Sequence, residues 1–215
     1  MKLRSVIALL FVVGAFSISA QDIVLPTPVV SGGMSLNDAL SRRHSVRSFD
    51  AARELPMQTL SDLLWAAVGV NRPDTGMRTN PTARNCQEIE AYVFNKNGVY
   101  KYDALANKLM KKADGDHRKL VAGTSGFSQS FVLDAPVSVV YVADLTKFND
   151  PSAPSSAMMG AVDAGIACQN LNLFCTANGL ATVPRATMDK DGIAKLLGLT
   201  AQQLPLMNNP VGYEK

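Results

Sequence analysis

The chain has 215 residues, of which 47% are hydrophobic and 18% charged, a composition that excludes a disordered protein and predicts one sizeable core. The formal net charge is +3, and two of the basic residues, Lys2 and Arg4, lie at the extreme N-terminus. The rest of the chain is nearly neutral, which argues against nucleic acid or an anionic membrane surface as a partner.

The first 20 residues have the pattern of a signal peptide. A positive start is followed by an apolar run over 6–16, too short to span a bilayer, and by small residues at 17–20. This pattern predicts cleavage before Gln21 and export to the periplasm, with an uncleaved membrane anchor as the alternative. We expect residues 21–215 to form one domain without a membrane span.

The first half of this domain combines helices with a hairpin. Ser35 is a good N-cap, Pro56 suits the first turn of a helix, Gly69 suits its end, and Asn97-Gly98 is a strong hairpin signal. In chain order we expect an extended arm (21–34), a short helix (36–44), a second helix (56–69), a polar loop (71–86) and a hairpin (91–95 with 99–102).

The second half alternates less regularly between helix and strand. Pro154 and Gly179 bound a long helix rich in small residues, and Asp189 caps a shorter one. In chain order we expect a helical region (103–133) broken near 123–126, a central β-branched strand (136–143), a long helix (154–178), a short strand (180–183), a helix ending at Leu197 and an extended tail (204–213). Without strict βαβ alternation, this order predicts an α+β fold with a mixed or antiparallel sheet.

The three cysteines, Cys86, Cys168 and Cys175, contain no CxxC pair, which argues against a disulfide framework or a zinc site. Cys168 and Cys175 are separated by about 10 Å along the expected helix, too far for a disulfide. We interpret both as core residues.

The segment 41–49 concentrates arginines, a histidine and hydroxyl groups where the first helix ends. Guanidinium and hydroxyl groups at this spacing can hold a phosphate or a polyol through charge-assisted hydrogen bonds. The alternative is a solvated helix end, where cations are favoured by the helix dipole.

Four separated segments, in order, resemble the FMN-dependent nitroreductase family, in particular its small exported members and its SagB/thiazoline-oxidase-like branch. They are Arg43-His44-Ser45-Val46-Arg47, similar to the family's Arg-x-Ser-x-Arg/Lys signature; the loop 81–87, similar to Pro-Ser-x-x-Asn-x-Gln; the segment 129–137; and the segments 163–165 and 178–184, followed by 209–213. The resemblance covers nearly all of residues 21–215.

The resemblance implies a mainly antiparallel sheet flanked by helices, an intertwined homodimer, and one FMN site built across the dimer interface. The implied cofactor-binding residues are Arg43, His44, Ser45 and Arg47 for the phosphate, ribityl chain and pyrimidine edge; Thr82, Ala83 and Asn85 from the partner subunit; Gln129 for the ring; and Pro184, Arg185, Ala186 and Thr187 along its edge, with a backbone N–H of Ala186 or Thr187 near N5. No metal and no separate catalytic residue are implied.

Two departures from the family pattern affect phosphate binding. The chain lacks the C-terminal basic pair of longer relatives, and its Gly212-Tyr213 is followed by Glu214 instead of proline. Phosphate binding is then expected to depend on Arg43 and Arg47, with Arg185 or Lys215 as auxiliary groups. Two roles are possible for Arg84: it contacts the substrate, or it pairs with Glu88.

The function implied is an FMN-dependent oxidoreductase that transfers hydride through flavin N5 to or from a small organic substrate, such as a nitroaromatic or a quinone, in ping-pong order. Export leaves the electron donor open between NAD(P)H and a redox protein. The alternatives are an exported flavin-binding protein without significant turnover and a binding module of this fold that holds no flavin.

Overall fold

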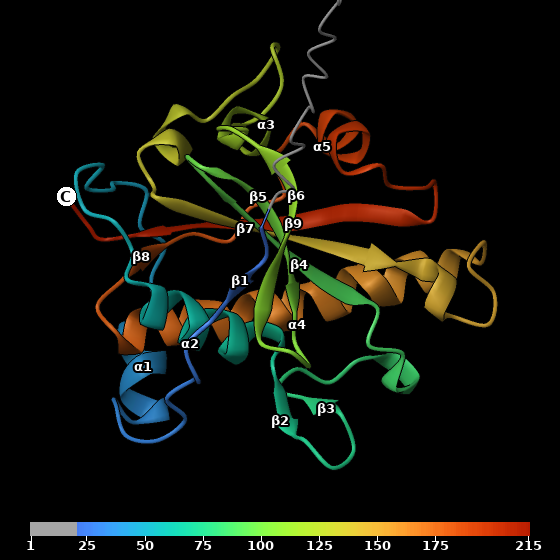
Figure 1. Cartoon of the computed structure of the whole chain (residues 1–215), viewed down its shortest axis with the longest axis horizontal. Coiled ribbons are helices and arrows are strands. Elements are labelled where there is room, and N and C mark those ends of the chain that lie inside the picture. The colour runs from blue at the N-terminus through green and yellow to red at the C-terminus, as the bar shows by residue number, and fades with distance from the viewer. Residues whose placement is uncertain (1–20) are drawn as a thin grey trace, which may run out of the picture.

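The computed structural model describes residues 21–215, so the expected signal peptide lies outside the described residues. Its centre is a seven-stranded sheet with the strand order β1-β6-β5-β4-β7-β9-β8 (Figure 1). The strands are β1 (Ile23–Val24), β4 (Ile89–Asn95), β5 (Gly98–Asp103), β6 (Lys108–Asp114), β7 (Val137–Asp144), β8 (Ala181–Thr182) and β9 (Gln203–Gly212). All neighbouring strands in this sheet pair antiparallel.

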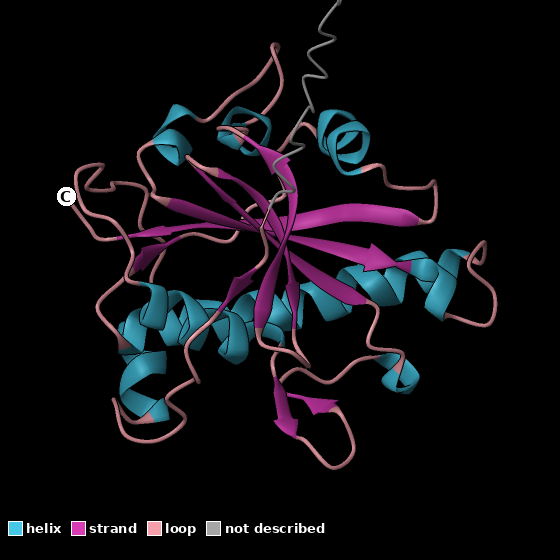
Figure 2. Cartoon of the chain, viewed as in Figure 1, coloured by secondary structure: helices cyan, strands magenta, loops and turns pink. Residues whose placement is uncertain are grey.

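Helices cover both faces of the sheet, giving three layers (Figure 2). One face carries α1 (Leu36–Arg42), α2 (Met57–Val68) and the long α4 (Pro154–Ala177), and the other carries α3 (Arg118–Ala122) and α5 (Lys190–Leu197). This arrangement confirms the α+β prediction and the expected antiparallel sheet between helices.

The central strands are buried on both faces because their alternating side chains fill two different cores. On β4, Ala91 and Val93 pack into the core beneath α2 and α4, whereas Tyr92 and Phe94 pack into the core on the α3 and α5 side. The predicted central strand over 136–143 is confirmed as β7, which lies between β4 and β9 and whose residues Val137 to Ala143 are all buried.

Local capping signals placed the helices correctly. The Ser35 side chain accepts a hydrogen bond from the Asp38 N–H at 3.1 Å, and the Asp189 side chain accepts one from the Gly192 N–H at 2.9 Å. Gly179, directly after the cap of α4, has φ +65°, a left-handed conformation that glycine adopts without strain. The expected hairpin is also confirmed, with Asn95 opposite Gly98.

The expected helical region over 103–133 is wrong in its first half, which forms a turn and β6. Asp103 Oδ1 accepts the backbone N–H groups of Leu105 and Ala106, both at 3.0 Å, and this turn reverses the chain after β5. Pairing with β5 and burial of Leu109 then favour a strand over a helix. Helical structure begins only at Arg118, and the predicted break near Gly123 is present.

The expected loop over 71–86 is correct only in part. It contains the small hairpin β2 (Val70–Arg72) and β3 (Met77–Arg78), and the short 3₁₀ helix η1 (Ala83–Asn85). Two further 3₁₀ turns, η2 (Ser130–Leu133) and η3 (Leu145–Lys147), flank β7.

The helix α4 is apolar around most of its circumference. Its inner face contacts the sheet closely: a Cβ at Gly160 would lie 2.9 Å from the Ala143 Cβ. Its outer face exposes Met158 by 56% and Val162 by 53%, and a Cβ at Gly165 would meet nothing within 4 Å. A surface helix normally has one polar face, so the apolar outer face of α4 is unusual for a helix exposed to solvent.

None of the helices within residues 21–215 has both the length and the hydropathy needed to cross a bilayer.

Candidate functional site

The segment that follows α1 is extended and places its polar side chains on one face. The Val46 N–H donates a hydrogen bond to the Thr182 carbonyl at 2.9 Å, which fixes the segment beside β8. Val46 is buried, and side chains alternate along an extended segment, so its immediate neighbours Ser45 and Arg47 point to the other side of the backbone, and Arg43, two positions before Ser45, lies on that same side. The set Arg43, Ser45 and Arg47 therefore shares one face, with Ser45 and Arg47 exposed and Arg43 half-buried.

His44 lies on the same side of the strand as Val46 but is exposed. Its Nδ1 lies 2.9 Å from the Arg42 carbonyl oxygen, a local contact that holds the ring against the end of α1. Any cofactor contact of His44 is therefore expected through its backbone.

The segment 184–187 continues from β8 and is fixed at one residue. Arg185 and Asn208 exchange two backbone hydrogen bonds, at 2.9 Å and 2.7 Å. Within residues 21–215, the N–H groups of Ala186 and Thr187 donate no hydrogen bond to the protein. Two backbone donors are thus left available at the position where the sequence predicts the flavin N5 edge.

The Arg185 side chain is directed inward and does not contribute to a phosphate site. It is 6% exposed, and it donates to Gln129 Oε1 and Asn208 Oδ1, both at 2.7 Å, and to the carbonyls of Val121 and Ala122, both at 3.1 Å. Every guanidinium nitrogen has an acceptor, so the expected auxiliary role of Arg185 in phosphate binding is not supported.

Gln129 is held at both its backbone and its side chain. Its N–H donates to the Ala122 carbonyl at 2.9 Å, and its Oε1 accepts from Arg185. An arginine can only donate, so the amide oxygen must face Arg185 and the Nε2 donor must face away from it. The Gln129 Nε2 group donates a hydrogen bond to none of the described residues.

Two aromatic rings connect these segments. The rings of Phe49 and Phe131 stack with centroids 6.3 Å apart, and the Arg185 guanidinium lies 5.6 Å from the centre of the Phe131 ring. The structure therefore brings together the segments 43–49, 129–131 and 184–187, as the predicted cofactor site requires.

The loop 81–87 is tightly held but lies elsewhere. The Ala83 N–H donates to Asp163 Oδ2 on α4 at 2.7 Å, and the Gln87 N–H donates to the Thr82 hydroxyl at 2.9 Å. Arg84, Asn85 and Gln87 all have φ between 52° and 55°, an uncommon conformation for residues other than glycine. Strained backbone of this kind is often found at functional sites.

The two parts of the predicted site lie at opposite ends of α4. Ala83 and Arg84 line a crevice with Ser155 and Met159 in the first turns of α4, whereas His44 and Val46 line one with Thr176 and Gly179 at its other end. Met159 and Thr176 are about 25 Å apart along a helix. In Figure 1, α1 lies beside one end of α4, and the green turn before β4 lies beside the other.

A pair of buried carboxyl groups beneath the loop 81–87 was not predicted from the sequence. Glu88 is 0% exposed, Asp163 is 5% exposed, and neither Glu88 oxygen has a donor within the described residues. Burial raises the pKa of Glu88 to about 7, with contact from Asp163 acting in the same direction. The alternative of an Arg84–Glu88 pair is wrong, because Arg84 is exposed and Glu88 is buried. The only sequence signal was a carboxylate at the head of an apolar strand.

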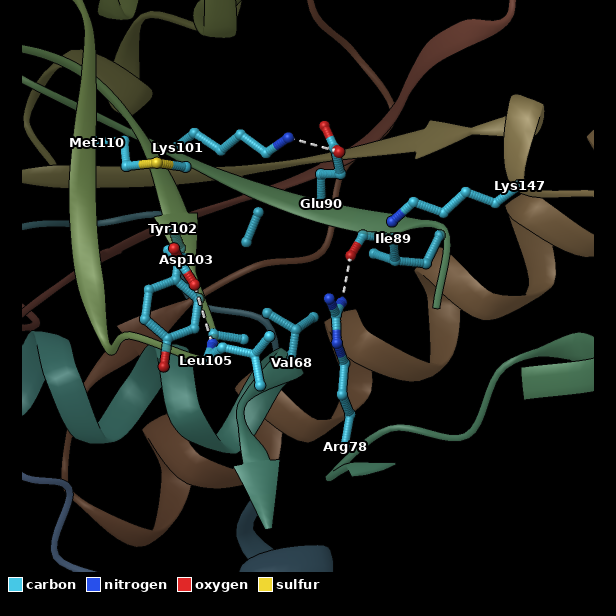
Figure 3. A pocket seen from close by; sticks show the side chains of 12 residues that line it. Val68, Arg78, Ile89, Glu90, Lys101, Tyr102, Asp103, Leu105, Met110 and Lys147 are labelled. Atoms are coloured by element: carbon cyan, nitrogen blue, oxygen red, sulfur yellow. Dashed lines mark hydrogen bonds and ion pairs between the residues drawn. The ribbon is translucent and has the colours of Figure 1, made fainter. Parts of the chain in front are cut away.

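A separate cavity of about 160 Å³ lies beside β4 and β5 (Figure 3). Its charged side chains are already engaged: Lys101 pairs with Glu90 at 2.6 Å, Arg78 donates to the Ile89 carbonyl, and Lys147 donates to the Gln87 carbonyl, both at 2.9 Å. The cavity therefore offers a ligand little unused charge. Cys168 and Cys175 are buried in the core as predicted.

Comparison with known proteins agrees with this geometry. The profile of the Nitroreductase family matches residues 40–213. A crystal structure described as a nitroreductase of Ralstonia eutropha JMP134 is 32% identical, with 90% of each chain covered and a TM-score of 0.82.

More distant structures share the fold. A nitroreductase-type structure from Anabaena variabilis ATCC 29413 has a TM-score of 0.72 at 19% identity, covering 91% of this chain and 42% of that chain. A chain of the E. coli microcin synthetase McbBCD complex has a TM-score of 0.68 at 18% identity, covering 99% and 85%. No curated protein sequence matches. Placement in the SagB/thiazoline-oxidase-like branch stays a prediction, but the profile match and the Ralstonia structure show that the chain belongs to the nitroreductase family.

Proposed function

We propose that the chain is an FMN-dependent oxidoreductase acting on a small organic substrate. The observation that carries this proposal is the linked set Phe49, Phe131, Arg185 and Gln129, which gathers three of the predicted cofactor segments around one position. Membership of an oxidoreductase family supports the general class of reaction.

The residues at this position fit FMN. Arg43, Ser45 and Arg47 present two guanidinium groups and a hydroxyl on one face, the donor set that a phosphate and a polyol require. The free donors, Gln129 Nε2 and the N–H groups of Ala186 and Thr187, suit a ring edge made of nitrogen and carbonyl acceptors. Bound FMN would supply two-electron hydride chemistry at N5 between a donor and a small acceptor such as a nitroaromatic or a quinone, in ping-pong order.

We propose that the active protein is a homodimer with sites at the subunit interface. The loop 81–87 cannot reach the segment 43–47 of its own chain, because nearly the whole length of α4 separates them. Pairing two copies of α4 antiparallel through their apolar outer faces would bring the loop of one chain to the segment of the other. The same pairing would cover Met158 and Val162 and fill the space beside Gly165.

The physiological donor and the exported location stay predictions. A neighbour described as an NADH oxidase of Clostridium acetobutylicum, with a TM-score of 0.58, makes NAD(P)H the first donor to test. If the protein is exported, the expected electron donor is a redox protein instead of NAD(P)H. The alternative is a flavin-binding protein without turnover. In either case the Arg185 side chain is committed internally, which leaves Arg43 and Arg47 as the main phosphate ligands.

The test is the visible absorption spectrum of residues 21–215 after loading with FMN and desalting, followed by reduction with NADPH or dithionite and reoxidation with menadione. We expect about one FMN per chain and rapid reoxidation. Arg43→Ala should weaken FMN binding roughly 10- to 100-fold, since it removes charge-assisted hydrogen bonds. Arg42→Ala is the matched control and should bind normally, because Arg42 lies on α1 outside the shared face.

Each other outcome selects an alternative. A protein that retains FMN but is not reoxidised by menadione is a flavin-binding protein without this turnover. A protein that retains no FMN, in wild-type form and as a dimer, contradicts the proposed function.

A further inference from the structure

Arg185 is a buried cation without an anionic partner. Its acceptors are two backbone carbonyls and two amide oxygens, and no carboxylate lies within ion-pair distance of it among residues 21–215. Burial lowers the pKa of Arg185 to about 10, so the group stays charged at neutral pH. Buried charges are normally paired with an opposite charge, so this positive charge is available to act on its surroundings.

Part of the contact set is structural. The carbonyls of Val121 and Ala122 belong to the last turn of α3, where a cation is favoured by the unsatisfied carbonyl groups. A neutral donor could satisfy these oxygens as well. The contact with Gln129 Oε1 at 2.7 Å is different, because it couples the charge to a side chain whose Nε2 group has no acceptor among the described residues.

This contact determines what Gln129 presents. With Oε1 held by Arg185, Gln129 can offer only the N–H groups of Nε2 to a ligand. The guanidinium behind the amide polarises it, which strengthens these N–H donors. A ligand atom at Nε2 must therefore be an acceptor, and it is favoured further when it carries negative charge.

We propose that Arg185 is a positioning residue that fixes Gln129 as a donor and, through its unneutralised charge, makes the site prefer the reduced, anionic form of the flavin ring. The proposal rests on the proposed function, since it concerns the same site. The relevant form of the ring has gained two electrons and one proton and carries one negative charge at its pyrimidine edge, where a nearby cation stabilises it.

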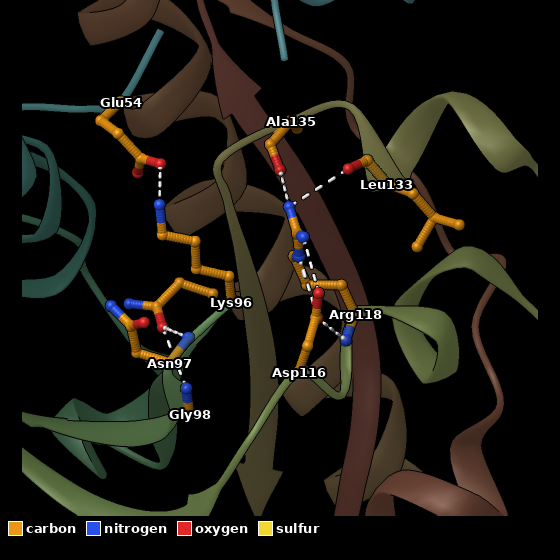
Figure 4. A network of polar contacts seen from close by, with 9 residues as sticks. Glu54, Lys96, Asn97, Gly98, Asp116, Arg118, Leu133 and Ala135 are labelled. Carbon is orange, nitrogen blue, oxygen red and sulfur yellow. Dashed lines mark hydrogen bonds and ion pairs between the residues drawn. The ribbon is translucent and has the colours of Figure 1, made fainter. Parts of the chain in front are cut away.

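Arg118 provides a matched control within the same layer of the structure. It also donates to two backbone carbonyls, those of Leu133 and Ala135, but Asp116 neutralises it at 2.6 Å (Figure 4). Replacing both partners, as Arg118→Met together with Asp116→Asn, removes a comparable structural contact and both opposite charges, so the net charge of this region does not change.

The experiment measures the midpoint potential of bound FMN by dye equilibration in the wild type, Arg185→Met, Arg185→Lys and the double variant Arg118→Met/Asp116→Asn. We expect Arg185→Met to weaken binding of reduced relative to oxidised FMN about tenfold, the effect of removing one charge at a partly buried site. This equals a lowering of about 30 mV for a two-electron couple. Arg185→Lys keeps the charge and should recover most of the shift, and the charge-neutral double variant Arg118→Met/Asp116→Asn should cause none.

A second variant covers the case in which Arg185→Met does not fold. Asn208→Asp places a carboxylate against the intact guanidinium, at the position where Asn208 Oδ1 now accepts from it. The variant neutralises the charge while Arg185 keeps its packing, and it should lower the potential by a similar amount.

The outcomes separate this inference from the proposed function. A wild type that binds no FMN contradicts the proposed function itself. A wild type that binds FMN, with potentials unchanged in Arg185→Met or in Asn208→Asp, overturns the role of Arg185 and leaves the proposed function standing. An equal shift in the charge-neutral double variant Arg118→Met/Asp116→Asn would show that the effect is structural and would also overturn it.

Discussion

Glu88 illustrates how a single buried side chain can link the stability of this protein to pH. The charged groups of neighbouring elements that act on it are Asp163 on α4, Lys147 on η3 and Arg78 on β3. Burial is the largest influence and raises its pKa, Asp163 adds to the increase, and Lys147 opposes it. With no donor at either oxygen, the carboxyl is more stable in the folded protein when it is protonated.

Glu88→Gln should therefore remove a specific pH dependence of stability. The pKa of Glu88 is about 4.5 in the unfolded chain and about 7 in the folded protein. Below the lower value Glu88 is protonated in both the folded and the unfolded state. Between the two values only the folded state retains the proton. The wild type should thus lose about 2–3 kcal/mol of unfolding free energy across this window, with no further loss from this group above it. The measurement is urea unfolding between pH 4.5 and 8.

Glu54→Gln is the matched control, because Glu54 is exposed and its partner Lys96 is exposed too. It should leave the slope of stability against pH unchanged. Glu88→Gln should be more stable than the wild type at pH 8, and an unaltered slope in that variant would contradict the assignment.

At the scale of elements, local chemistry decided which parts of the fold could be predicted. Caps and helix-ending residues such as Ser35, Asp189 and Gly179 act on their own neighbours, so the sequence placed α1, α4 and α5 nearly correctly. β6 was missed because its strand conformation depends on pairing with β5 and β1, not on the propensity of its own residues.

The same distinction applies to the candidate site. The cluster of polar groups at 43–47 was predictable from its pattern, and the structure places it beside β8, directly before the segment 184–187. The inward direction of Arg185 and the Glu88–Asp163 pair were not predictable, because each depends on partners more than 50 residues away. The division of the site between the ends of α4 appears only in three dimensions.

The loop 81–87 should depend on Asp163 for its conformation. Asp163→Ala removes the acceptor of the Ala83 N–H, and the strained residues Arg84, Asn85 and Gln87 favour opening. We expect trypsin to cleave after the exposed Arg84 roughly tenfold faster than in the wild type under native conditions. The rate of appearance of the fragment ending at Arg84, measured by mass spectrometry, tests this.

Asp163→Asn is the matched control, since its amide oxygen can still accept from Ala83 while its N–H group can donate to Glu88. This variant should be cleaved at the wild-type rate. Equal rates for the wild type and Asp163→Ala would show that other contacts hold the loop, such as that between Gln87 and Thr82.

For the whole molecule, α4 is both the link and the spacer between the two parts of the site. Its 24 residues span about 36 Å, and its apolar outer face lies between Met158 near one end and Gly165 further along. An isolated chain leaves this face uncovered and keeps the two parts of the proposed site apart. One antiparallel pairing of two copies would resolve both, which is why we expect assembly and cofactor binding to be inseparable.

Mixing two defective variants should restore FMN binding. Arg43→Ala damages the segment at one end of α4, and Asn85→Gly damages the loop at the other while keeping the positive φ of that position. If each site combines the segment of one chain with the loop of its partner, a mixed dimer has one doubly defective site and one intact site. Random mixing after mild unfolding and refolding should then recover about one quarter of the wild-type FMN absorbance.

If each chain held a complete site, every site in the mixture would carry one defect and no recovery would occur. Gly165→Leu in both variants is the control: the added side chain has open space within its own chain but should block pairing of the α4 outer faces, giving a folded monomer by light scattering and no recovery. Recovery that persists in this monomer would show that the two ends of α4 do not need to meet across an interface.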